Sequence, residues 1–362
     1  MFYHLLYPLK DLWFGFNVFR YITFRASMAA VTAFLLSIIV GPAIIGWLKK
    51  WNVGQYIRRQ HVDDIYDLHK HKEGTPTMGG AMIIVSVLIS TILWARLDND
   101  FIILVLGGMV WMGIIGFIDD YLKLKTKSPK GVHAMTKIVG QVSLALIVGL
   151  FVLRNSAIGT DLYLRFLKNA VANLGVFYIL FILLVIVGTS NAVNLTDGLD
   201  GLAIGCVVFV ALTYAVVSYV TGNAVASKYL NVFYLSGSGE LTCFCAALAG
   251  AGLGFLWFNG PPASIFMGDT GALSLGGAIG IVSVLIKKEA LLLIAGGIFA
   301  VEALSVILQV LFFKLGKKRL FLMTPIHHHF QIKGLAESKI TVRFWIIAAL
   351  LALLSMTTLK VR

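Results

Sequence analysis

The sequence predicts an all-α, polytopic integral membrane protein with about ten transmembrane helices and both termini on the periplasmic or extracellular side. Hydrophobic residues make up 59% of the 362 residues, charged residues make up only 13%, and the mean hydropathy is +0.88. An ordinary soluble domain has about 25% charged residues, so this composition excludes a soluble globular fold. The apolar residues also fall into runs of membrane-spanning length, separated by short polar segments.

Ten runs with few or no charges predict the helices in chain order. They cover residues 26–48, 76–95, 101–118, 138–153, 173–193, 201–221, 241–258, 271–286, 290–313 and 344–359. Residues 1–25 are rich in aromatic side chains but are interrupted by charges, which predicts an interfacial helix rather than a cleavable signal sequence. We expect the whole chain, residues 1–362, to form one transmembrane domain whose active site consists of five cytoplasmic loops.

The distribution of basic residues predicts the orientation. The loops that follow the odd-numbered runs contain 18 of the 30 Lys and Arg residues. An excess of Lys and Arg marks cytoplasmic loops, so these loops are expected in the cytoplasm and both termini outside. We attribute the net charge of +13 to these cytoplasmic loops, which would face anionic lipids or substrates. We do not interpret it as a sign of nucleic-acid binding.

The candidate chemistry lies in five short polar segments, all on this predicted cytoplasmic face. They are residues 74–77, Asp119-Asp120, residues 194–200, Gly268-Asp269 and His327-His328-His329. Carboxylates at a membrane boundary usually line a polar cavity or pair with a cation, and Mg²⁺ prefers oxygen ligands. Any single Asp is equally well explained as a helix cap. The spacing of Asp197 and Asp200 would place both on one side of a helical turn.

Four other polar features bear on the site. Consecutive histidines on a helix diverge by about 100°, so a structural Zn²⁺ site at residues 327–329 is the weaker metal hypothesis. The hydroxyls and glycines of residues 72–80 are expected to let backbone amides approach an anion, although the segment is no Walker loop. Lys123 and Lys137 are candidates for phosphate contact, and Glu302, within the ninth run, is assigned no catalytic role.

The chain resembles the polyprenyl-phosphate N-acetylhexosamine-1-phosphate transferase superfamily over essentially its whole length. The motifs that carry the resemblance lie at residues 74–80, 116–121, 191–201, 255–259 and 325–330. Its branch with a muramoyl donor is the most similar, because three histidines follow Pro325-Ile326. This resemblance implies an Mg²⁺-dependent enzyme of the bacterial inner membrane, with its active site on the cytoplasmic face. It would transfer phospho-N-acetylmuramoyl-pentapeptide from its UDP-linked donor to undecaprenyl phosphate, releasing UMP and forming lipid I for peptidoglycan, the cell wall.

The resemblance also implies roles for individual residues. Asp269 is the expected metal ligand, and Asp119, with Asp120 beside it, is the candidate for taking a proton from the lipid phosphate. A direct displacement and a route through an aspartyl-phosphate both stay open. The expected substrate contacts are Lys72, Thr77, Lys123, Lys137, Asn194, Asp197, Asp200, Asn259, Phe266, His327, His328 and His329. Phe266 would stack on uracil, and His327 and His329 would shape the loop around His328.

Two alternatives remain at this point. A sister enzyme would use UDP-N-acetylglucosamine as the donor. A divalent-cation transporter would instead need ionisable groups at mid-membrane depth, where only Glu302 is found. Members of the superfamily often dimerise, so a homodimer is a further expectation.

Overall fold

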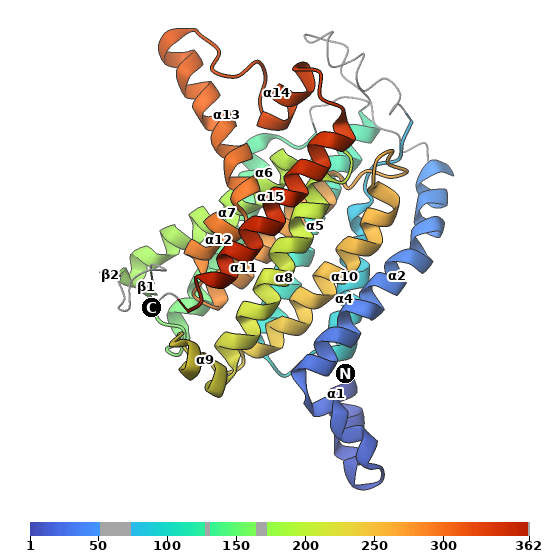
Figure 1. Cartoon of the computed structure of the whole chain (residues 1–362), viewed down its shortest axis with the longest axis vertical. Helices are drawn as coiled ribbons and strands as arrows, with labels where there is room; N and C mark the ends of the chain where they lie inside the picture. Colours follow the sequence, from blue (N-terminus) through green and yellow to red (C-terminus); the bar gives the residue numbers. More distant parts are fainter. Residues whose placement is uncertain (51–73, 127–130, 164–171, 361–362) are drawn as a thin grey trace.

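The structure, a computed structural model, describes residues 1–50, 74–126, 131–163 and 172–360. These residues are almost entirely helical (Figure 1). The long helices are α2 (Ile22–Lys50), α4 (Gly80–Trp94), α5 (Asp100–Lys125), α6 (Ala134–Arg154), α7 (Tyr178–Thr196), α8 (Leu202–Gly222), α10 (Leu241–Asn259), α11 (Gly268–Leu285), α13 (Gly297–Gly316) and α15 (Glu337–Thr357). The shorter elements are α1 (Phe2–Leu6), η1 (Tyr7–Asp11), η2 (Phe14–Arg20), β1 (Asp161–Leu162), β2 (Ala172–Asn173), η4 (Gly175–Phe177), α9 (Ala224–Leu230), η5 (Ser238–Glu240), α12 (Glu289–Ala295) and α14 (Ile326–Ile332).

The apolar runs correspond to helices, with two differences. Within the described residues, nine helices are long and apolar enough to cross a membrane, and α4 is a shorter apolar helix of 15 residues. At 1.5 Å per residue, α4 spans only about 22 Å of a hydrocarbon layer that is roughly 30 Å thick. The ninth run is divided at Gly296 into α12 and α13. The protein is therefore a polytopic helical membrane protein, while the count of ten spans and the orientation stay predictions.

Helices α8, α10 and α11 form the centre of the bundle. In the apolar 18-residue segment of each of these helices, 78%, 78% and 89% of the residues are buried, respectively. The corresponding value is 22% for α2 and for α13. Small residues allow the central helices to approach their neighbours closely. A Cβ on Gly80 of α4 would lie 2.1 Å from the backbone nitrogen of Gly271 in α11, so a glycine is required at this crossing.

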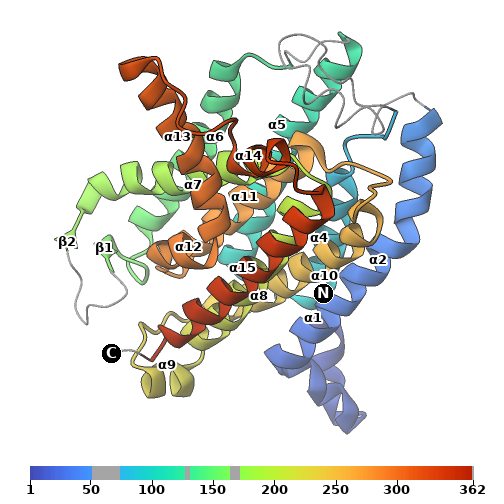
Figure 2. The same cartoon turned by 45° about the horizontal axis from the view of Figure 1, so that its top comes forward.

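The two ends of the bundle differ in character. Both chain termini lie at the end away from α14 (Figure 1). The predicted interfacial segment consists of α1, η1 and η2, and its Leu12 and Phe14 side chains are more than 80% exposed. Helix α13 leans away from the bundle in both views (Figures 1 and 2).

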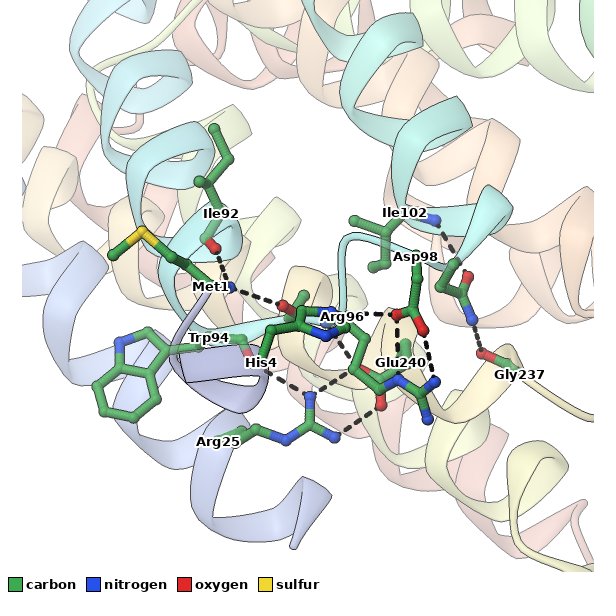
Figure 3. A network of polar contacts seen from close by, with 12 residues as sticks. Met1, His4, Arg25, Ile92, Trp94, Arg96, Asp98, Ile102, Gly237 and Glu240 are labelled. Atoms are coloured by element: carbon green, nitrogen blue, oxygen red, sulfur yellow. Dashed lines mark hydrogen bonds and ion pairs between the residues drawn. The ribbon is translucent and has the colours of Figure 1, made fainter. Parts of the chain in front are cut away.

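A polar network closes the end near the N-terminus (Figure 3). The guanidinium of Arg25 donates two hydrogen bonds of 2.6 Å to Glu240, which also accepts one from the backbone of Arg96. Arg96 in turn pairs with the exposed Asp98. Because Arg25 and Glu240 are almost fully buried, their pairing removes the cost of an isolated charge. The network joins α2, η5 and the loop before α5 at the end opposite the carboxylate cluster described next.

Candidate active site

Three carboxylates from distant parts of the chain meet at one end of the bundle. Asp119 and Asp120 lie near the end of α5, and Asp269 is the second residue of α11. One oxygen from each lies within 4.8 Å of the others. Helices α5 and α11 approach closely here, since a Cβ on Gly116 would lie 2.2 Å from the carbonyl oxygen of Asp269. Residues about 150 positions apart thus form a single anionic cluster.

Two lysines neutralise part of this charge. Lys123 Nζ lies 2.5 Å from Asp119 Oδ2 and 3.1 Å from Asp269 Oδ2. Lys137 Nζ, from the first turn of α6, lies 2.9 Å and 2.6 Å from the same two oxygens. Three carboxylates and two ammonium groups leave the cluster with a formal charge of about −1. The predicted phosphate-contacting lysines therefore lie directly beside the predicted metal ligand.

Asp120 has a different environment from Asp119. Its carboxylate accepts hydrogen bonds from the backbone nitrogens of Asp269 (3.2 Å) and Thr270 (2.9 Å) and from Thr270 Oγ1 (2.7 Å). A carboxylate on the first amides of a helix satisfies their free donors and complements the helix dipole. Asp120 therefore caps α11 and orients Asp269. The helix-cap interpretation of the aspartates thus holds for Asp120, although the capped helix is α11 and not its own helix α5.

The C-terminal end of α7 provides two more of the predicted residues. Asn194 donates a 2.9 Å hydrogen bond to Asp269 Oδ1. Asp197 is the C-cap of α7 and accepts a hydrogen bond from the backbone of Gly268. Burial, followed by the neighbouring carboxylates, raises the pKa of Asp197 to about 8. This side chain is thus expected to carry a proton at pH 7.

The side chains of Asp200 and Asn259 make hydrogen bonds with backbone groups. Asp200 Oδ2 accepts from the amide of Ala263 at 2.9 Å. The side chain of Asn259 accepts from Gly201 N at 3.0 Å and donates to the carbonyl of Ile265 at 2.8 Å. These contacts hold the turn between α7 and α8 against the loop before α11. The expectation that Asp197 and Asp200 share a helical turn is wrong, because α7 ends at Thr196 and α8 begins at Leu202.

The glycine-rich segment before α4 makes backbone hydrogen bonds to the loop before α11. The amides of Gly79 and Gly80 donate to the carbonyls of Phe266 (2.8 Å) and Met267 (2.9 Å). These two amides are not available to an anion, so the predicted anion-binding role is wrong for them. The segment instead aligns the loop that carries Phe266 and leads into Asp269. Thr77 lies beside Gly268, and Lys72 is outside the described residues.

The three histidines point in different directions, as their spacing predicts. His327 Nδ1 lies 3.1 Å from Glu302 Oε1 in the interior. His328 Nδ1 pairs with Gln331 at 2.7 Å, and His329 Nδ1 accepts from the amide of Leu322 at 3.2 Å. Within the described residues, the histidines belong to no group that could hold a metal. This arrangement disfavours the Zn²⁺ hypothesis.

Sequence reasoning missed several residues at this end. Thr270 holds Asp120, the amide of Val132 donates to Asp119 Oδ1 at 2.7 Å, and Glu337 accepts from the amide of Asp200 at 2.7 Å. Thr270 directly follows the Gly268-Asp269 motif and could have been included with it. Val132 acts through its backbone, so its side chain carries no signal.

The carboxylate cluster has the donors that a hard divalent cation needs. Asp119 Oδ2 is buried, and it lies within ion-pair distance of the ammonium groups of Lys123 and Lys137. The carboxylate oxygens lie close enough together to share one ion. These residues therefore fit a cation such as Mg²⁺.

The chain is similar to known transferases over its whole length. A model of glycosyl transferase family 4 matches residues 102–287. A signature of phospho-N-acetylmuramoyl-pentapeptide-transferases matches residues 72–84. Proteins of that name from Desulfotalea psychrophila, Citrifermentans bemidjiense and Geobacter sp. strain M21 are 52%, 53% and 53% identical to this chain, with complete coverage of both sequences in each case.

Proposed function

The chain belongs to the phospho-N-acetylmuramoyl-pentapeptide-transferase family, and we propose that it transfers phospho-N-acetylmuramoyl-pentapeptide from the UDP-linked donor to undecaprenyl phosphate. An oxygen of the lipid phosphate attacks the sugar-linked phosphorus of the donor. The bond from that phosphorus to the bridging oxygen breaks, UMP leaves, and lipid I remains in the membrane. The meeting of Asp119, Asp269, Lys123 and Lys137 at one end of a membrane bundle carries this proposal.

The physical problem in this reaction is the approach of two anions. Lys123 and Lys137 lie where they can contact phosphate oxygens and offset the repulsion. Asp269 would hold an Mg²⁺ ion, which would neutralise charge on the transferring phosphate. Asp120 keeps α11 in the orientation that presents Asp269. Asp119 is the proposed proton acceptor from the lipid phosphate, whose second pKa is near 6.

The remaining assignments follow the same arrangement. Asn194 and Asp197 border the cluster and are proposed donor contacts, together with Phe266 and His328. The cluster lies at the end of the bundle whose loops carry most of the basic residues, which supports a cytoplasmic active site. The homodimer stays a prediction.

The test is formation of lipid I and UMP by purified protein, supplied with both substrates and Mg²⁺. UDP-N-acetylglucosamine serves as the competing donor. We expect Asp269→Asn to reduce turnover at least about 100-fold, whereas the matched control Asp98→Asn, at the opposite end, keeps the wild-type rate. An inactive wild-type protein that is folded and loaded with Mg²⁺ would refute the proposed function.

A further inference from the structure

A buried acid and a buried histidine meet outside the carboxylate cluster. Glu302 lies in the second turn of α13, and His327 lies in the first turn of α14. Both side chains are fully buried, and His327 Nδ1 is 3.1 Å from Glu302 Oε1. Neither side chain makes a hydrogen bond of normal geometry with any described residue, so the 3.1 Å approach of His327 Nδ1 to Glu302 Oε1 is an ion-pair contact. Each therefore depends on the other to offset the cost of burying a polar group.

The opposite edge of the His327 imidazole lies against Gly198, in the turn that is proposed to contact the nucleotide-sugar donor. A Cβ on Gly198 would lie 2.2 Å from His327 Nε2 and 2.9 Å from His327 Cε1. A glycine is therefore needed for His327 to pack at this distance. Gly198 stands between the proposed donor contact Asp197 and the turn at Asp200. His327 thus bridges α13 and the turn between α7 and α8.

The imidazole also sets the position of its neighbour. The rings of His327 and His328 have centroids 4.2 Å apart. His328 is the proposed donor contact of α14, a helix of only 7 residues that has little internal stability of its own. A rotation of His327 would move both Gly198 and His328.

We propose that Glu302 is a positioning residue for the nucleotide-sugar donor. It holds the His327 ring against Gly198 and thereby places His328 and Asp197 on their side of the site. An apolar side chain would fill the same volume without orienting the ring, and buried ion pairs usually give little net stability. The role of Glu302 is therefore orientation more than stability. This inference rests on the proposed function.

The variants Glu302→Leu, Glu302→Gln and His327→Leu test it, with Ser305→Ala as the matched control. Ser305 is buried one turn further along α13, and its hydroxyl donates a hydrogen bond to the carbonyl of Glu302. We expect Glu302→Leu to raise the KM for the UDP-linked donor about tenfold and to leave the KM for undecaprenyl phosphate within about twofold. Glu302→Gln should recover most of the loss, because its amide oxygen can still accept from the imidazole.

A double-mutant cycle separates orientation from general packing. If Glu302 acts through His327, the double variant should raise the donor KM no further than the larger single change. Independent tenfold effects that multiply to about 100-fold would overturn the proposal. So would a donor KM that stays at the wild-type value while the melting temperature falls.

Binding of UMP, measured by calorimetry without the lipid substrate, gives a readout besides turnover. We expect Glu302→Leu to weaken this binding and Ser305→Ala to leave it unchanged. Wild-type protein is assayed in parallel. Normal turnover with unaltered UMP binding in Glu302→Leu would refute only this inference, whereas absent wild-type turnover would refute the proposed function.

Discussion

Asp120 offers the sharpest test of how the site is built, because its three hydrogen bonds all go to the start of α11. The residue is 3% exposed, and its carboxylate accepts from two backbone amides and one hydroxyl. Asp120→Ala would leave these three donors without a partner in a buried place. Hydrogen bonds to charged groups contribute about 1.5–3 kcal/mol each, but the substitution also removes the cost of burying the carboxylate. We therefore expect a net loss of roughly 4 kcal/mol.

Asp120→Asn should cost about half as much. Its remaining oxygen can still accept from the amide and hydroxyl of Thr270. Its NH₂ group then faces the amide of Asp269, whose hydrogen bond is lost. Thermal unfolding in detergent, followed by tryptophan fluorescence, should show a decrease of several degrees for Asn and about twice that for Ala.

Turnover distinguishes a helix cap from a group that reacts. If Asp120 acts by orienting Asp269, activity and melting temperature should fall together across the two variants. Excess Mg²⁺ should restore part of the activity, since a displaced ligand weakens metal binding. An Asp120→Asn protein that melts like the wild type but has no activity at any Mg²⁺ concentration would refute the cap interpretation.

Three further predictions concern other parts of the molecule. Asp119→Asn should slow turnover about 10- to 100-fold at pH 7, and a rate close to wild type at pH 8 would argue against proton transfer by Asp119. Gly80→Ala should lower the melting temperature by several degrees, because its Cβ would meet the backbone of Gly271 at 2.1 Å, whereas Gly107→Ala has open space and should be tolerated. Burial lowers the pKa of Lys287 to about 8. Between about pH 8 and 10.5 the unfolded chain therefore binds more protons at this side chain than the folded chain does. The free energy of unfolding should accordingly rise with pH across that window, by up to about 3 kcal/mol. Unfolding measured against pH should show this rise in the wild type, and the idea fails if Lys287→Met shows the same slope.

Much of this protein could be read from local chemistry. Long apolar runs predict helices and a membrane setting, because a chain in lipid must satisfy its backbone hydrogen bonds internally. The predicted runs correspond to helices, including the weaker one at α4. The motifs also pointed to one shared location, and Asp119, Asp120, Asn194 and Asp269 do converge at one end of the bundle. These results depend on composition and on neighbouring residues, which any single segment displays.

What each polar group contacts could not be read in this way. Asp119 and Asp120 are adjacent in sequence, yet one faces the lysines and the other caps a helix 150 residues away. The glycine amides that looked ready for an anion are paired with the Phe266 segment. The sequence did not indicate that Glu302 and His327 are partners, and the packing of α13 and α14 places them 3.1 Å apart. Such contacts depend on how helices cross, because a shift of one residue along a helix turns the side chain by about 100°. The sequence can place a carboxylate at the membrane boundary, but the packing of the helices determines which group it contacts.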